Sequence, residues 1–198
     1  MKSSAASRRG VFLAVLGTWW AASAQATDGG VEELRARYAG QWRFSGDASE
    51  RAAVPAAVEH SVDGMFFISR GIAYDRLIHV CEICTPYTLS FADGEVEVRS
   101  PCQITDKSPE DGRDVDHVTR AGDASKLSQR FVAGMLVQEF RGEGGSRRVV
   151  WRVEPGSDSL SVQVTITSKH LPNAVEYTLS YRRIPPTHFP RDAGPSGG

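Results

Sequence analysis

Strict alternation of apolar and polar residues near the C-terminus is the feature that most constrains the fold of this 198-residue chain. Residues 160–167 and residues 175–182 each place an apolar side chain at every second position. The apolar sets are Leu160, Val162, Val164 and Ile166, then Val175, Tyr177, Leu179 and Tyr181. Side chains of a strand point alternately to the two faces of a sheet, so both segments are predicted as strands with one buried face. Such one-sided burial is typical of antiparallel sheets.

Shorter stretches with the same period precede these two strands along the chain. They are residues 41–45, 56–62, 65–70, 74–82, 87–92, 95–99, 127–133, 136–141 and 149–153. Asp93-Gly94 is the clearest turn between them, because this dipeptide favours the two-residue type I′ hairpin loop. That loop would pair Ala92 with Glu95 and Leu89 with Val98. Residues 106–125 form the one loop long enough to hold a crossover connection.

The sequence therefore predicts an all-β fold, an antiparallel up-and-down barrel of about 8–10 strands. A short helix over residues 31–38, ended by Gly40, precedes the first strand. A β-sandwich is the alternative, because alternation alone does not exclude a crossover. The barrel domain is expected to cover residues 27–184, and the Pro- and Gly-rich residues 185–198 are expected to be a disordered tail.

The first 26 residues have the composition of a cleavable signal peptide. Lys2, Arg8 and Arg9 precede an apolar run over residues 11–22, which is too short for a stable bilayer anchor. Ala24-Gln25-Ala26 fits the preference of signal peptidase, so cleavage after Ala26 predicts a periplasmic or secreted protein. The general secretory route is expected, and the twin-arginine route, suggested by Arg8-Arg9, is the alternative.

Charge and hydropathy exclude two classes of partner for the mature chain. Cleavage removes three of the 23 basic residues and none of the 24 acidic ones, which leaves 20 against 24 and a net charge near −4. Nucleic-acid binding needs a basic surface, so no nucleic-acid partner is expected. No later segment approaches 18 consecutive apolar residues, so no membrane span is expected either.

Three cysteines, Cys81, Cys84 and Cys102, remain after cleavage. In an oxidising compartment, one disulfide with one remaining thiol is the default arrangement. The Asp93-Gly94 hairpin would place Thr85 opposite Cys102, one residue from Cys84. We therefore predict the disulfide Cys84–Cys102, with Cys81–Cys102 as the alternative.

Other motifs give no support for catalysis, for a metal or for a cofactor. The Cys81-Glu82-Ile83-Cys84 motif is expected at the end of a strand, whereas redox motifs need a helix N-terminus that lowers the thiol pKa. The three cysteines with His79 or His117 match no standard zinc spacing. No serine lies in a G-x-S-x-G motif, and no nucleophile and base occur at a recognisable sequence spacing, so no catalytic residue is predicted. A protein that is not an enzyme is expected.

Both ends of the predicted barrel resemble calycins, the group of lipocalins and fatty-acid-binding proteins. Gly40-Gln41-Trp42 opens the first strand, where these families carry G-x-W, and Tyr181-Arg182-Arg183 ends the last strand, where they carry an arginine. The resemblance implies that these strands are neighbours and that Arg183 stacks on Trp42 as a structural latch. The T-D-Y pattern and the C-terminal helix of lipocalins are missing from this sequence.

Ligand binding in the barrel interior is the leading functional hypothesis, because barrels of this size can hold one small molecule. The ligand would be small and hydrophobic or amphipathic. The predicted ligand-binding residues are Trp42, Phe44, Phe131, Trp151, Tyr177, Tyr181 and Arg183. The alternative is a filled barrel that serves as a scaffold, with loops such as residues 106–125 binding another envelope protein or inhibiting an enzyme. An enzyme on a barrel scaffold is the third hypothesis.

Overall fold

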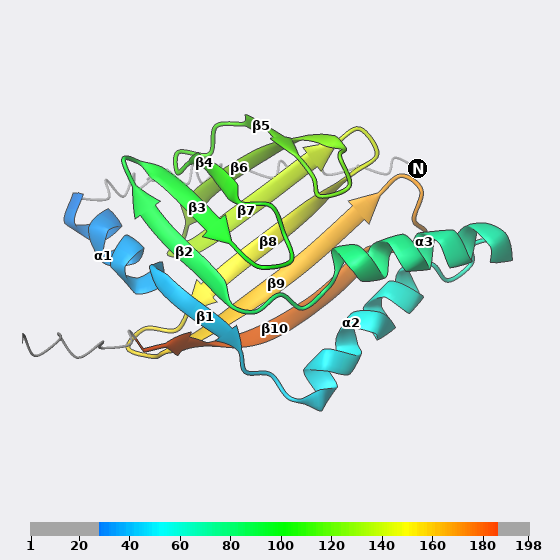
Figure 1. Ribbon diagram of the computed structural model, residues 1–198, viewed down its shortest axis with the longest axis horizontal. Helices are drawn as coiled ribbons and strands as arrows, with labels where there is room; N and C mark the ends of the chain where they lie inside the picture. Colours follow the sequence, from blue (N-terminus) through cyan, green and yellow to red (C-terminus); the bar gives the residue numbers. More distant parts are fainter. Residues whose placement is uncertain (1–27, 186–198) are drawn as a thin grey trace, which may run out of the picture.

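Ten antiparallel strands and three helices make up residues 28–185, the part of the chain that the computed structural model describes (Figure 1). Every strand pairs with its neighbours in the sequence except that β4 and β5 do not pair, and β1 also pairs with β10, so the sheet has the order β4-β3-β2-β1-β10-β9-β8-β7-β6-β5. The elements are α1 (Asp28–Tyr38), β1 (Gly40–Phe44), α2 (Ala48–Ser61), α3 (Phe67–Val80), β2 (Tyr87–Ala92), β3 (Glu95–Arg99), β4 (Asp106–Pro109), β5 (Val115–Val118), β6 (Ala124–Val132), β7 (Met135–Gly142), β8 (Gly145–Val153), β9 (Ser159–Ser168) and β10 (Val175–Ile184). The prediction of an up-and-down, calycin-like barrel is confirmed.

Pairing between β1 and β10 closes one side of the barrel, with Trp42 opposite Arg183 and Phe44 opposite Tyr181. The predicted hairpin between β2 and β3 is also confirmed, since Ala92 pairs with Glu95 and Leu89 with Val98. Asp93 and Gly94 in its turn have φ values of 53° and 74°. A type I′ turn requires positive φ at both central positions, and the Asp-Gly dipeptide meets that requirement.

The prediction of strands at residues 56–62, 65–70 and 74–82 was wrong, because these residues belong to α2 and α3 or to the turns that follow them. Asp47 starts α2, and its carboxylate accepts hydrogen bonds from the backbone N–H groups of Ser49 and Glu50. This N-cap, followed by an alanine-rich segment, favours a helix. Short apolar windows fit either period, so alternation did not separate the two structures there.

Residues 106–125 were predicted as a loop, and this prediction was wrong as well. The segment contains two short strands, β4 and β5, and it makes no crossover. The buried positions of β4 are Asp106 and Ser108, which are polar. Alternation of hydrophobicity therefore gives no signal for this strand.

The helices lie at different places around the barrel (Figure 1). Helix α1 lies beside one end of the strands, and α3 lies near the other end, where it contacts α2. Helix α2 packs against β10 and buries Val54 and Val58, whereas α3 has no buried residue. Among residues 28–185, no helix has the length and apolar character needed to cross a bilayer. The predicted signal peptide and, apart from Pro185, the predicted tail lie outside the described residues.

Candidate functional site

Arg183 and Trp42 form the predicted stack at the β1–β10 junction. The guanidinium carbon of Arg183 lies 4.2 Å from the centre of the Trp42 ring, a cation–π distance. The same guanidinium donates to the carbonyl oxygens of Arg37 and Ala39, and its Nε lies 3.3 Å from a carboxylate oxygen of Asp158. Arg183 is thus occupied by protein groups and acts as a latch, although the sequence also placed it among the ligand-binding residues.

Tyr38, at the end of α1, closes the barrel at this same end. Its side chain is fully buried, and its hydroxyl donates to the carbonyl oxygen of Gly134 at 2.9 Å or to that of Trp151 at 3.0 Å. Its ring packs edge-on against Phe131 with 5.4 Å between the centres. Burial raises the pKa of the Tyr38 hydroxyl, so it stays protonated and continues to donate. Sequence reasoning missed this residue.

Aromatic rings fill much of the barrel interior. Tyr87, which was not predicted, lies between Trp151 and Tyr181, with ring-centre distances of 4.9 and 5.3 Å. The predicted residues face inward as expected: Trp42, Trp151, Tyr177 and Tyr181 are buried, and Phe44 and Phe131 are partly buried. Two hollows, of about 490 and 420 Å³, indent the described part of the chain, one at the β7–β8 turn and one between α2 and the start of β10.

Arg147 brings a positive charge into this interior from the inner face of β8. It lies opposite Phe140 on β7 and Ile166 on β9, and its guanidinium carbon is 5.8 Å from the Phe140 ring centre. The amide oxygen of Gln103, in the orientation that its contacts require, accepts from both terminal nitrogens at 3.1 and 3.2 Å. The buried Nε of Arg147 has no partner among residues 28–185, and no carboxylate of these residues comes within 4.0 Å of the guanidinium.

The alternation of side-chain directions along a strand could have revealed Arg147, because residues two apart share a face. Arg147 therefore lies on the inward face of β8 with Val149 and Trp151. The predicted strand began at Val149 and so left the arginine outside it. Its neighbour Arg148 points to the other face and is 54% exposed. The two adjacent arginines therefore have opposite environments.

Three tyrosines and the free thiol of Cys81 share the interior with Arg147. Burial raises the pKa values of the Tyr87, Tyr177 and Tyr181 hydroxyls, and the charge of Arg147 opposes that rise in each. Burial also raises the pKa of the Cys81 thiol, and a hydrogen bond with the Tyr177 side chain partly offsets this rise. All four groups are therefore neutral at pH 7, and they can donate hydrogen bonds.

The cysteines are arranged as predicted, with a disulfide between Cys84 and Cys102 and a free, buried Cys81. A structural disulfide is typical of an oxidising compartment. The motif follows helix α3, not a strand as expected, and Cys81 is the residue at the C-terminal cap of that helix. A helix C-terminus disfavours a thiolate, so Cys81 lacks the lowered pKa of a redox cysteine.

Strands β4 and β5 form the second junction of the barrel, and they are not paired with each other. Side chains bridge the gap on the inner side. Nε2 of His117 lies 2.9 Å from Oδ1 of Asp106, and Nε2 of Gln138 donates to Oδ2 of the same carboxylate at 3.1 Å. The hydroxyl of Ser108 donates to Oε1 of Gln129 at 2.9 Å. Burial raises the pKa of Asp106, against the opposing effects of His117 and Arg147.

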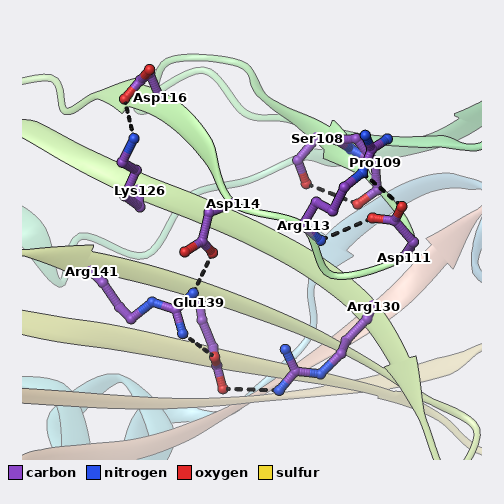
Figure 2. Close-up of polar contacts among 10 residues, drawn as sticks. All are labelled: Ser108, Pro109, Asp111, Arg113, Asp114, Asp116, Lys126, Arg130, Glu139 and Arg141. Atoms are coloured by element: carbon purple, nitrogen blue, oxygen red, sulfur yellow. Dashed lines mark hydrogen bonds and ion pairs between the residues drawn. The ribbon is translucent and has the colours of Figure 1, made fainter.

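Ion pairs hold the same region on the outer side, as Figure 2 shows. Arg141 on β7 pairs with Asp114, which precedes β5, and Nζ of Lys126 on β6 lies 2.7 Å from Asp116. The first pair ties the β4–β5 connection to β7, the second ties β5 to β6, and an isolated bridge between Asp111 and Arg130 joins the connection to β6. Asp111, Asp114 and Asp116 of this segment are each paired with a basic side chain of the protein.

The start of α3 exposes a group of large apolar side chains. The exposed fractions are 68% for Phe66, 72% for Phe67, 57% for Ile68 and 55% for Ile72. The opposite side of α3 packs against the core through the partly buried Tyr74, Leu77 and Ile78, and no residue of the helix is fully buried.

Several solved structures are similar to this chain over most of its length, at low sequence identity. A fatty-acid-binding protein from Schistosoma mansoni in complex with arachidonic acid is 15% identical, with 76% of this chain and 98% of that chain covered and a TM-score of 0.45. A secretory abundant heat soluble protein from Ramazzottius varieornatus is 11% identical, with coverages of 75% and 96% and a TM-score of 0.49. Human cRBP IV is 15% identical, with coverages of 74% and 97% and a TM-score of 0.44.

No protein-family model matches the sequence, and no curated protein matches it.

Proposed function

We propose that this protein binds a small amphipathic molecule whose acidic headgroup is held by Arg147. The observation that carries the proposal is the environment of this side chain. A guanidinium faces the barrel interior, its buried Nε has no partner in the described chain, and no carboxylate of residues 28–185 lies within 4.0 Å.

Gln103 accepts from both terminal nitrogens of Arg147, but the buried Nε has no acceptor in the described chain, and a buried donor without an acceptor costs free energy. An acidic group beside Arg147 would supply the acceptor that Nε lacks. It would also accept from the neutral hydroxyls of Tyr87 and Tyr177, whose raised pKa values keep them protonated. The Tyr181 hydroxyl already donates to the carbonyl oxygen of Cys84 at 3.2 Å. Arginine with two hydroxyl donors is a suitable set for a carboxylate.

The packed interior limits the size of the proposed ligand and indicates its path. Trp42, Trp151 and Tyr181 occupy the α1 half, so a long chain has no room there without repacking. Helix α3 has no fully buried side chain, and it contacts the core through the partly buried Tyr74, Leu77 and Ile78. We expect the ligand to enter beneath α3, with its acidic group toward Arg147 and its short apolar part against the inner face of this helix.

The test compares two neighbouring arginines with opposite environments. Binding of octanoate and dodecanoate, and of the uncharged alcohols octanol and dodecanol, is measured by calorimetry on the oxidised protein, for wild type, Arg147→Gln and Arg148→Gln. We expect the acids to bind, with affinity reduced about tenfold or more in Arg147→Gln, the size of a lost charged hydrogen bond. Arg148→Gln should leave both affinities unchanged.

Two results would contradict the proposal. One is the absence of binding for every acid in wild-type protein that circular dichroism shows to be folded. The other is an equal effect of Arg147→Gln on acid and alcohol, since that would indicate repacking of the barrel and no contact with the acidic group.

The filled interior favours one alternative function, a scaffold that binds another envelope protein. The predicted docking segment, residues 106–125, serves this alternative less well than expected. Asp106, Ser108 and His117 point inward, and Asp114 and Asp116 are paired with basic side chains. The calorimetric series separates the two functions, because a scaffold does not bind the acids.

Export to the periplasm or the medium is also proposed, through a signal peptide cleaved after Ala26. The disulfide between Cys84 and Cys102 supports an oxidising destination. N-terminal sequencing of the protein from the envelope or medium of expressing bacteria should start at Thr27. A full-length chain confined to the cytoplasm would contradict export, and replacing Arg8 and Arg9 by lysine would separate the two routes.

A further inference from the structure

Three side chains at the β4–β5 gap have the arrangement of a nucleophile, a base and an orienting acid. The hydroxyl oxygen of Ser125 on β6 lies 3.1 Å from Nδ1 of His117 on β5. The other ring nitrogen, Nε2, lies 2.9 Å from Oδ1 of Asp106 on β4. Serine hydrolases place these three residue types in this order on unrelated folds, with Nε2 of the histidine toward the serine and Nδ1 toward the acid. In this protein the two ring nitrogens are exchanged.

The hydrogen-bond pattern around His117 favours the tautomer that such chemistry needs. An ionised Asp106 only accepts, so Nε2 carries the hydrogen and donates to it. The lone pair of the neutral ring is then on Nδ1, which faces the Ser125 hydroxyl. That hydroxyl can also donate to the carbonyl oxygen of His117, but at the longer distance of 3.3 Å. Gln138 donates to the second oxygen of Asp106 and fixes the carboxylate.

The exposure of the three side chains increases from Asp106 through His117 to Ser125. The side chain of Asp106 is 5% exposed and that of His117 is 11% exposed, whereas Ser125 is only half-buried. A base and its orienting acid are thus shielded from water, and the nucleophile lies nearest to solvent. Water around an orienting carboxylate weakens its hold on the base, so this gradient suits the proposed roles.

Access to Ser125 would be through the nearby surface. Strands β4 and β5 share no backbone ladder, and side chains span the gap between them. A hollow of about 490 Å³ lies next to this gap: Gly142 and Gly145 line it, and a side chain on Gly142 would lie 3.7 Å from the carbonyl oxygen of Ala124, the residue before Ser125. We expect the ester to approach from this hollow, although Ser125 itself does not line it. The Phe140 ring, 5.2 Å from that of His117, gives the site an apolar wall.

We propose that Ser125, His117 and Asp106 form a hydrolytic site for small carboxylic esters with an apolar acyl group. This inference rests on the β4–β5 gap and not on Arg147, so it stands or falls independently of the ligand-binding proposal.

The proposed reaction uses the ester and water. Oγ of Ser125 attacks the carbonyl carbon while its proton passes to Nδ1 of His117. The bond to the leaving oxygen breaks, that oxygen takes the proton from His117 and departs as the alcohol, and the acyl group stays on Ser125. Water then attacks the acyl carbon, gives its proton to His117, and releases the carboxylic acid as the proton returns to Oγ. Asp106 is a positioning residue that stabilises the imidazolium.

Hydrolysis of p-nitrophenyl acetate and p-nitrophenyl butyrate by the oxidised full-length mature chain is the first measurement. A fluorophosphonate probe, followed by peptide mass spectrometry, is the second. We expect catalysed hydrolysis with butyrate preferred, and labelling at Ser125. Ser125→Ala should remove both, and His117→Asn should lower the rate at least about a hundredfold while keeping a hydrogen bond to Asp106.

Ser128→Ala is the matched control, since Ser128 lies on the same strand, on its other face, and its hydroxyl has no partner within residues 28–185. This variant should keep full rate and labelling. Asp106→Asn should lower kcat with KM unchanged, which a general loss of packing would not do. It should also fold at neutral pH, because it removes a buried charge whose pKa is raised.

Failure of wild-type protein to exceed the spontaneous rate, with no label on Ser125, would overturn the proposal. So would activity that Ser125→Ala retains, because the nucleophile would then lie elsewhere. Loss of activity in Ser128→Ala to the same degree would show that the effect comes from the fold of β6 and not from the three side chains.

Discussion

The barrel closes at two junctions, and they are built from different groups. At the first, β1 and β10 join through a backbone ladder of four residue pairs, and Arg183 stacks on Trp42 across it. At the second, β4 and β5 form no ladder, and side chains such as His117 and Asp106 bridge the gap. Backbone hydrogen bonds thus close the first junction, whereas hydrogen bonds between particular side chains close the second.

The difference matters for function because, at the β1–β10 junction, the polar groups of Trp42 and Arg183 are bound to other groups of the protein. Trp42 donates to the carbonyl oxygen of Tyr38 at 3.0 Å, and Arg183 is bound to two carbonyl oxygens and one carboxylate. Across the barrel, Nε2 of Gln129 and Nε of Arg147 lack partners among residues 28–185. Another buried donor without a partner in the described chain, Nε1 of Trp151, lies in the α1 half of the barrel. Both proposed activities lie at the side-chain junction and beside it.

Among the variants that test this comparison, Trp42→Ala should change the free energy of unfolding most. The ring is fully buried, so its loss should lower the free energy of unfolding by about 3–5 kcal/mol. Urea denaturation followed by circular dichroism measures the change. Trp42→Phe keeps most of the ring volume and should cost clearly less. Equal costs for the two variants would show that the Nε1 hydrogen bond, and not packing, stabilises this junction.

Cys102→Ala tests the covalent support of the second junction. Cys102 lies between β3 and β4, its disulfide closes a loop with a sequence separation of 18, and Nη1 of Arg120, from the β5–β6 connection, donates to its carbonyl oxygen. A loop of this length predicts a loss of about 3 kcal/mol in unfolding free energy. Adding dithiothreitol should cost wild-type protein a similar amount and the variant nothing. A variant that remains sensitive to the reductant would contradict this assignment.

The first junction was largely predictable from the sequence, because its signals are local and periodic. The stack of Arg183 on Trp42 was predicted through the resemblance to calycins, and parity along the last strand supported it, because Arg183 shares a face with Tyr177 and Tyr181. The Asp93-Gly94 turn set the β2–β3 register in the same way and so led to the disulfide. Each inference used parity along one strand or across one hairpin.

The second junction was not predictable, because its members have no periodic pattern and no common motif. In β4, polar residues occupy the inner positions, so the strand has no hydrophobic alternation. Asp106, His117 and Ser125 meet only because three different strands end at the same gap. Helices α2 and α3 were missed for another reason, since their short apolar windows fit strand and helix alike.

Ser108→Ala should have a smaller effect than the loss of the disulfide, and it acts on the side-chain closure alone. Oε1 of Gln129 accepts from Ser108, and Nε2 of Gln129 already lacks a partner in the described chain, so the variant leaves a fully buried amide with neither bond. An unsatisfied buried group costs about 1–3 kcal/mol. Ser128→Ala, which removes a buried hydroxyl with no partner among residues 28–185, should cost far less. Similar losses in the two variants would contradict the bridging role of Ser108.

Arg183→Lys should have the smallest effect, because it keeps the positive charge at the first junction. Lysine lacks the planar guanidinium that stacks on Trp42 and reaches the carbonyl oxygens of Arg37 and Ala39 together, so part of the cation–π contact is lost. We expect a decrease of about 1 kcal/mol in the free energy of unfolding. Arg182→Lys is the matched control on the exposed face of the same strand, and it should change stability by less than about 0.5 kcal/mol. If the two variants are equally stable, the backbone ladder closes this junction without help from the stack. The contrast between the two junctions would then be sharper still, since only the second would depend on its side chains.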